Sequence, residues 1–87
     1  MVDKRILELR NQIDQIDDEI ISLLLKRMEV SRSVGELKAE LHIPIEDKSR
    51  EETIIQKLTD KAGEILTEEQ LIRIFTAVFK SSKQIQK

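Results

Sequence analysis

One stretch of the chain carries cations and small residues at a spacing that would place them together. Arg27, Ser31, Gly35 and Lys38 fall close to one side of a helix. A glycine inside a helix costs about 1 kcal/mol relative to alanine, and it usually serves a close approach. The two cations are 11 residues apart, about 16 Å along a helix axis. Long side chains leaning inward would then grip one small dianion in a concavity.

Each of these residues also has a purely structural interpretation. Arg27 interrupts a series of Ile, Leu and Val residues, where an unpaired guanidinium is costly to bury. It therefore needs an anion or a carboxylate to meet, or it extends to solvent or pairs with an acid such as Glu29. Lys38 taken alone is a solvated surface lysine, and Gly35 alone is a contact between helices. The residues themselves leave both interpretations open.

A second polar group lies shortly after Pro44, and it contains Asp47, Arg50 and Glu51. Asp47 is a suitable N-cap, and acidic residues near a helix N-terminus are favoured by the helix dipole. Glu51 falls one turn before Ile55, so its carboxylate points toward the apolar side. There it would bind a hydroxyl group or pair with a cation.

A third polar group lies near the end of the chain. Ser82 and Gln86 continue the apolar face formed by Phe75, Val78 and Phe79. Neutral hydrogen-bonding groups at this spacing indicate a pocket, whereas the structural alternative is a fraying polar terminus. The chain thus offers three separate polar groups that a fold would have to bring together.

The composition excludes several classes of function. The 87 residues suffice for one domain, they include no Cys, and their only His is His42, so a thiolate, a zinc site or a serine-type triad is not expected. A net charge of −2 with two Phe and no Tyr or Trp is unlike a nucleic-acid binder. With no long apolar run and no apolar signal core, we expect a cytoplasmic domain without a membrane span.

The elements that must position these residues are helices. Apolar residues recur at alternating spacings of three and four from Ile6 to Leu41, a pattern that only a helix fits. This helix is predicted over about residues 3–42, and it ends before Pro44 because the residue preceding a proline disfavours helical backbone angles.

Two shorter helices are predicted after it. The first spans about residues 48–62, capped by Asp47 or by a capping box of Ser49 and Glu52. The second spans about residues 67–86, opening at Thr67 with a capping-box glutamine three residues later. The predicted fold is all-α, with three helices, one of them very long, in a single domain of residues 1–87.

The long helix predicts a second chain. Its apolar stripe from Ile6 to Leu41 covers 36 residues, about 54 Å of helix, which exceeds the roughly 31 Å diameter of a compact 87-residue globule. A symmetric partner chain laid along the same stripe would cover it, whereas a bend or break at Gly35 is the alternative. Arg10 lies 17 residues from Arg27, about 25 Å along the helix. One small ligand could meet both arginines only if Arg10 comes from the partner chain.

In order and spacing, these residues resemble the all-helical chorismate mutases of the AroQ type over essentially the whole chain. No single motif is specific, but their combination is. The motifs are Leu9-Arg10, Lys26-Arg27, Val34-Gly35-x-x-Lys38, Pro44-Ile45-x-Asp47-x-x-Arg50-Glu51, Ile74-Phe75 and Ser82-x-x-x-Gln86. The resemblance implies an intertwined homodimer with two pockets, each completed in trans by Arg10, and the rearrangement of chorismate to prephenate on the route to phenylalanine and tyrosine, with no cofactor.

The resemblance also implies a role for each site residue. Arg10 of the partner chain and Arg27 would hold the two carboxylates of chorismate with the help of Ser82, and either arginine could take either carboxylate. Lys38 and Gln86 would donate hydrogen bonds to the ether oxygen. The ring hydroxyl would be held by Glu51 and the backbone near Asp47, in a corner that Arg50 orients.

Two other functions compete with this interpretation. An isochorismate–pyruvate lyase of the same fold binds an isomeric dianion, but the pair Asp47 and Glu51 resembles the mutase pattern. A non-catalytic dimerisation or regulatory module of an aromatic-pathway enzyme, fused to it or associated with it, is the second. Arg27, Lys38 and Gln86 argue against it, because a structural coiled coil gains nothing from them.

Overall fold

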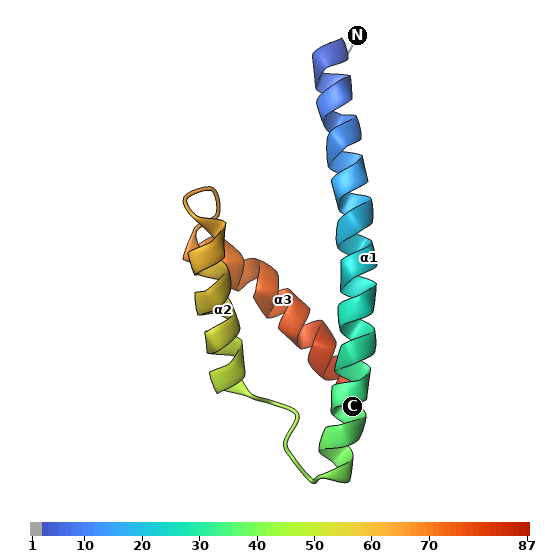
Figure 1. The fold of residues 1–87 in the computed structure, drawn as a ribbon, viewed down its shortest axis with the longest axis vertical. Coiled ribbons are helices and arrows are strands. Elements are labelled where there is room, and N and C mark those ends of the chain that lie inside the picture. The colour runs from blue at the N-terminus through green and yellow to red at the C-terminus, as the bar shows by residue number, and fades with distance from the viewer. Residues whose placement is uncertain (1–2) are drawn as a thin grey trace.

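Residues 3–87 of the computed structural model form three helices and no strand (Figure 1). The helices are α1 (Lys4–Glu40), α2 (Lys48–Ala62) and α3 (Glu68–Gln86). The predicted all-α class is therefore confirmed, with one helix much longer than the other two.

The long helix α1 is continuous. Asp3 caps its first turn by accepting a hydrogen bond from the Arg5 backbone N–H at 2.8 Å. The helix passes through Gly35 without interruption, so the alternative of a break there is wrong. It ends at Glu40, two residues before the predicted end, because His42 adopts a left-handed conformation with φ of 58°.

This helix end is a Schellman motif. The backbone N–H of Ile43 donates to the Lys38 carbonyl at 2.8 Å, and that of His42 donates to the Ala39 carbonyl at 3.3 Å. Two of the last carbonyls of α1 thereby find partners. The chain then turns away from the helix axis before it reaches Pro44.

The caps of the two shorter helices decide where they begin. Asp47 caps α2 by accepting from the Arg50 backbone N–H at 2.9 Å, so the alternative cap at Ser49 is wrong. Thr67 and Gln70 form the predicted capping box of α3, with reciprocal hydrogen bonds of 3.1 and 2.9 Å. Gly63, with φ of 66°, ends α2.

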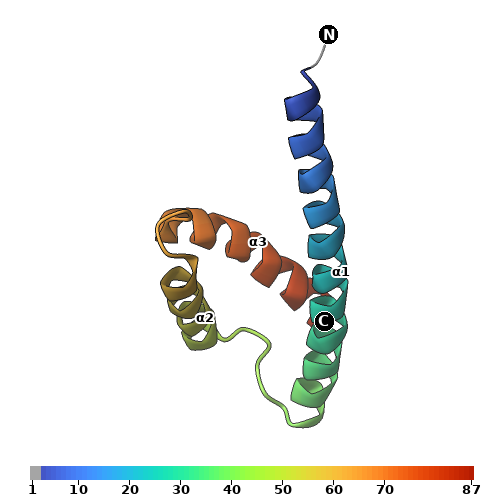
Figure 2. The same cartoon turned by 45° about the horizontal axis from the view of Figure 1, so that its top comes forward.

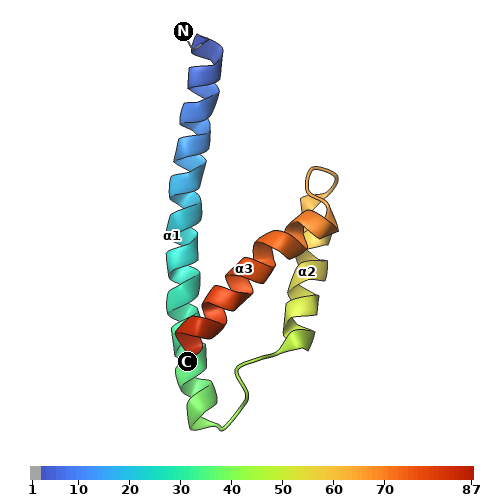
Figure 3. The same ribbon diagram turned by 180° about the vertical axis from the view of Figure 1, so that it is seen from behind.

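The three helices form an open arrangement in which α3 is the link. It packs against α1 and against α2, whereas α1 and α2 share no close backbone contact over residues 3–87. Figures 1, 2 and 3 show α3 running from α2 to the C-terminal half of α1. In all three views the N-terminal half of α1 projects beyond the other two helices.

The chain exposes far more surface than a compact monomer of its size. Its radius of gyration is 16.7 Å, and its longest extent is 58 Å. A compact chain of 87 residues would have a radius of gyration of about 12 Å. The accessible surface is 7574 Å², against about 5,300 Å² expected for a folded monomer of 10.1 kDa.

The excess surface is largely apolar. Among the described residues only Leu71 and Phe79 are buried apolar side chains, while Ile13, Ile16 and Ile20 on α1 are each about half exposed. A soluble chain rarely leaves so long an apolar stripe uncovered. One chain by itself therefore does not form a complete hydrophobic core.

Candidate active site

A cavity of about 180 Å³ lies where the C-terminal half of α1, the start of α2 and the end of α3 converge. It brings together seven of the eight residues that the sequence singled out, although they come from three separate parts of the chain. These seven are Arg27, Lys38, Asp47, Arg50, Glu51, Ser82 and Gln86. Ser31 lines the same cavity, as the strip on α1 predicts.

Arg27 projects from α1 toward α3 and is half-buried. Its Nη1 donates a hydrogen bond to the buried hydroxyl of Ser82, and its guanidinium carbon lies 5.8 Å from the centre of the Phe79 ring. Within residues 3–87 its contacts are a neutral hydroxyl and an aromatic face rather than an acidic side chain, so its charge is held in place without being neutralised. An anionic ligand as the partner of Arg27 stays a prediction.

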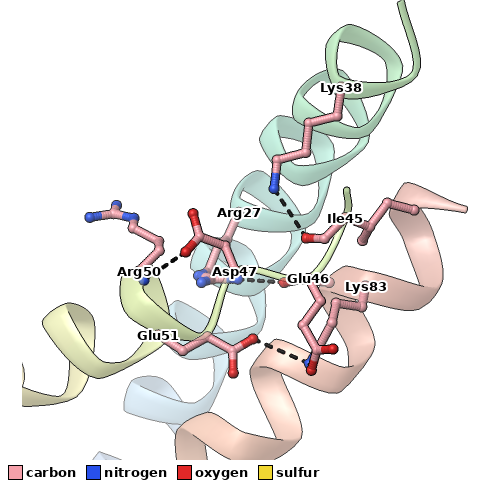
Figure 4. Close-up of polar contacts among 9 residues, drawn as sticks. Arg27, Lys38, Ile45, Glu46, Asp47, Arg50, Glu51 and Lys83 are labelled. Atoms are coloured by element: carbon pink, nitrogen blue, oxygen red, sulfur yellow. Dashed lines mark hydrogen bonds and ion pairs between the residues drawn. The ribbon is translucent and has the colours of Figure 1, made fainter. Parts of the chain in front are cut away.

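Lys38 lies three turns further along α1 and is half-buried rather than solvated. Its Nζ donates to the backbone carbonyl of Ile45 at 3.1 Å (Figure 4). This bond joins α1 to the segment that leads into α2. An ammonium group has three donors, so the contact with a neutral carbonyl leaves two for a ligand and leaves the charge intact.

Glu51, in the first turn of α2, pairs with a cation that the sequence reasoning did not single out. The Nζ of Lys83 on α3 lies 3.2 Å from Glu51 Oε2 and 3.4 Å from Glu46 Oε1 (Figure 4). The hydrogen bond with Glu51 is the main cause that raises the pKa of Lys83 above its ordinary value. The inward carboxylate predicted from the position of Glu51 is thus present at the cavity.

Gln86 approaches α1 at its closest point. A Cβ atom added to Gly35 would lie 2.6 Å from Gln86 Cα, so only glycine permits this contact. The amide of Gln86 lines the cavity, and its Oε1 is buried without a hydrogen-bond partner among residues 3–87. A buried oxygen without a hydrogen-bond partner costs free energy.

The remaining predicted residues differ in how deeply they lie. Arg50 lines the cavity with an exposed side chain, and Asp47 uses its carboxylate to cap α2. Arg10 does not line the cavity. It is exposed on the projecting half of α1, so no part of the cavity is reached by Arg10 of the same chain.

Lys83 could have been found from the sequence by its spacing. Phe79, Ser82, Lys83 and Gln86 share one face of α3, at the i, i+3, i+4 and i+7 positions. Its place on this face, beside the neutral Ser82 and Gln86, is the signal that marks Lys83 as a cavity residue. The apolar side chains of Val34, Ile45 and Ile54 complete the lining.

The charges of the cavity suit a small dianion. Four cationic and two anionic side chains line it, which gives two net positive charges. Its hydrogen-bonding groups include a hydroxyl and an amide, and its apolar residues provide a surface for a ring. Residues 3–87 contain no cluster of His, Asp or Glu placed to hold a metal ion, and none of their helices meets the length and hydropathy that a membrane span requires.

Comparison with known proteins gives one consistent result. The family model of chorismate mutase type II matches residues 9–87. A chorismate mutase of Methanocaldococcus jannaschii is 34% identical over 85 residues, which cover 97% of this chain and 86% of that protein. The solved structure of the Helicobacter pylori chorismate mutase in complex with prephenate superposes with a TM-score of 0.89 at 34% identity, covering 97% of this chain and 91% of that one.

A longer relative shows a fused context. The bifunctional chorismate mutase/prephenate dehydratase of Aquifex aeolicus is 31% identical over 84 residues, which are 92% of this chain but 23% of that protein. The match of the family model, the identity over nearly the full chain and the superposition agree with the resemblance inferred from the motifs. The chain belongs to the chorismate mutase type II family.

Proposed function

We propose that the cavity between α1, α2 and α3 binds chorismate and converts it to prephenate, a step in the biosynthesis of phenylalanine and tyrosine. The observation that carries this proposal is the convergence of Arg27, Lys38, Glu51 and Gln86 on one cavity. They come from three segments, and they supply cations, an acceptor and a neutral hydrogen-bonding group around apolar walls. Chorismate has two carboxylates, a ring hydroxyl and an enolpyruvyl ether. Arg27 suits one carboxylate, Glu51 suits the hydroxyl, and Lys38 with Gln86 suits the ether oxygen, while the second carboxylate is left to Arg10 of the partner chain.

The reaction is an intramolecular rearrangement. The ether C–O bond breaks while a C–C bond forms between the enolpyruvyl carbon and the ring, so no atom leaves and no proton moves. The protein therefore has two tasks, which are to hold the substrate in its folded conformer and to stabilise the charge of the transition state.

Arg27 performs the first task together with Ser82. The Ser82 hydroxyl and the Phe79 ring fix the guanidinium, which can then bind a carboxylate without losing further side-chain entropy. Glu51 accepts a hydrogen bond from the ring hydroxyl, next to the backbone near Asp47, and Arg50 orients this corner at the rim of the cavity.

Lys38 and Gln86 perform the second task. Negative charge grows on the ether oxygen as the C–O bond breaks, and donors already aimed at that atom stabilise the transition state more than the ground state. Lys38 supplies a charged donor, held by the Ile45 carbonyl. Gln86 supplies the amide N–H₂ group, held by the contact of its backbone with Gly35.

The proposed assembly is an intertwined homodimer in which Arg10 completes the pocket of the partner chain. One chain exposes about 2,300 Å² more surface than a compact monomer, which is the scale of an obligate interface. A second hollow of about 690 Å³ lies between α2 and α3, with apolar Ile55 and Ile72 in its lining. In the proposed homodimer, the projecting N-terminal half of α1 from the partner chain fills this hollow with its apolar face.

The assay for this function is steady-state turnover of chorismate by the purified protein, followed by its loss of absorbance and by chromatography of the product. We expect prephenate. A parallel incubation with isochorismate distinguishes the lyase alternative, because that reaction would release pyruvate. A folded protein that consumes neither compound would support the non-catalytic module. Fusion to a second enzyme, as in the Aquifex aeolicus relative, is compatible with any of these activities.

A further inference from the structure

We propose that Lys83 is a positioning residue of the pocket, which holds the Glu51 carboxylate in place to receive the ring hydroxyl of the substrate. This inference rests on the proposed function and assigns a part to a residue outside the set that the sequence predicted. It is carried by the ion pair between α3 and the first turn of α2, at the edge of the cavity.

The ammonium group of Lys83 on α3 contacts two other segments, which are the first turn of α2 and the residues that precede it. Lys83 Nζ lies 3.2 Å from Glu51 Oε2 on α2 and 3.4 Å from Glu46 Oε1, the residue before the cap of α2 (Figure 4). The side chains of Lys83 and Glu51 are 27% and 26% exposed, whereas that of Glu46 is 57% exposed. The pair with Glu51 is therefore the better shielded from solvent, and we expect it to be the stronger of the two.

The ion pair addresses a difficulty of the site. A carboxylate that faces a dianionic ligand is repelled by it, and a glutamate side chain is free to turn toward solvent. Lys83 lines the cavity and offsets the charge of Glu51, and it restricts that carboxylate to one orientation. One oxygen of Glu51 is engaged by the lysine, and the carboxylate has further lone pairs to accept the hydroxyl.

Lys83 also differs from the other cations of the cavity. Arg27 and Lys38 contact neutral groups, a hydroxyl and a carbonyl, so their charges are available to the substrate. Lys83 already meets two carboxylates. Its charge is therefore already paired within the protein, so Lys83 acts through Glu51 rather than on a substrate carboxylate.

The test is a double-mutant cycle on kcat/KM for chorismate with Lys83→Met and Glu51→Gln. If Lys83 acts through Glu51, Lys83→Met lowers kcat/KM about tenfold in the wild-type background, and the same change has little effect once Glu51 is Gln. Lys83→Arg should restore most of the loss, because it keeps the cation. Lys80→Met, at an exposed position of the same helix, is the matched control and should leave kcat/KM unchanged.

Circular dichroism and the mass in solution show whether each variant is folded and assembled as the wild type is. Glu46→Gln gives a second measurement that does not depend on Lys83→Met, and its effect should be smaller than that of Glu51→Gln. Losses that add in the double variant, or an unchanged kcat/KM for Lys83→Met, would overturn this inference while wild-type turnover upholds the function. A folded wild type that leaves chorismate unchanged would overturn both.

Discussion

At the scale of single residues, the cations of the pocket divide by the charge of their partners. Arg27 is held by a hydroxyl and a ring, and Lys38 by a backbone carbonyl, so neither charge is neutralised by the protein. Lys83 is paired with carboxylates. Neutral partners fix a cation in position and leave its attraction for an anion, which is the arrangement that a site for a dianionic substrate requires.

Lys38 and Gln86 should matter chiefly in the transition state. We expect Lys38→Ala to lower kcat by about 100- to 1,000-fold, with a smaller rise in KM, because it removes a donor to the ether oxygen. Gln86→Ala should cost less, since a charge-assisted hydrogen bond is about twice as strong as a neutral one. Steady-state kinetics on folded variants measures both, with Lys80→Ala as the exposed control. A variant whose KM rises while its kcat is unchanged would contradict the assignment.

A Gln86→Glu variant sharpens this prediction. A carboxyl group donates a hydrogen bond only when it is protonated, so this enzyme should be poor at pH 7 and improve as the pH falls. The wild type, measured over the same range, corrects for other groups. A pH profile parallel to that of the wild type would mean that residue 86 does not donate to the ether oxygen.

Most residues of the cavity could be predicted because they break a pattern. Arg27 interrupts an apolar series, and Gly35 is a glycine inside a helical pattern, so each is visible in the sequence. The hydrogen bond from Arg27 to Ser82 was not predictable from any local pattern, because the two residues are 55 positions apart and the contact depends on how α1 and α3 cross. Lys83 was not predicted as a site residue, because a lysine near a helix end is common. Only its position on the same face as Phe79 and Gln86 distinguishes it.

At the scale of elements, the contact of Gly35 with Gln86 sets how closely α1 and α3 approach. The atoms nearest to an added Cβ include the backbone of Gln86, its Cα at 2.6 Å and its carbonyl oxygen at 2.8 Å. A backbone cannot rotate away as a side chain can. The glycine therefore fixes the position of the helix that carries Ser82, Lys83 and Gln86.

Gly35→Ala should destabilise the protein although it improves helix propensity. The gain from propensity is about 1 kcal/mol, whereas forcing α1 and α3 apart typically costs about 1–3 kcal/mol. We expect a net loss of stability in urea at one fixed protein concentration, together with lower activity. Ser33→Ala, at an exposed position of α1, serves as the control and should change stability by only a few tenths of a kcal/mol. A Gly35→Ala protein as stable and active as the wild type would show that the two helices can separate freely.

The helices were predictable because their signals are local. Alternating apolar spacing, Asp47 and the Thr67–Gln70 capping box each act within a turn or two. The end of α1 was placed two residues late, since the left-handed turn at His42 has no glycine to announce it. The arrangement with α3 between α1 and α2 depends on contacts across the chain, which no local pattern encodes.

At the scale of the whole molecule, the exposed stripe of α1 should be the interface of the proposed homodimer. We expect a mass near 20 kDa at micromolar concentration, about twice the 10.1 kDa of one chain. Ile16→Asp should dissociate and unfold the protein, because it places an unpaired carboxylate in that stripe. Asp18→Asn, a polar change nearby on α1, is the control for light scattering or sedimentation. A wild type near 10 kDa, or a folded Ile16→Asp monomer, would contradict the interface.

The proposed role of Arg10 in the partner's pocket makes a separate prediction. Arg10→Ala and Arg27→Ala proteins should each be nearly inactive, yet a mixture refolded together should regain activity. Each mixed dimer has one pocket with both defects and one with neither, so random pairing restores about a quarter of the wild-type activity. Refolding each variant alone is the control. No recovery among verified mixed dimers would exclude a pocket shared between chains.

The projecting half of α1 makes the activity and the stability of the protein depend on its concentration. If its apolar face is covered only by another copy, the final step of folding is a collision between two chains, and its rate rises with the square of their concentration. The apparent melting temperature then rises with concentration as well. Dilution would remove catalytic power per milligram even while every covalent bond stays intact. For such a chain, the abundance at which it is made is part of the description of its native state.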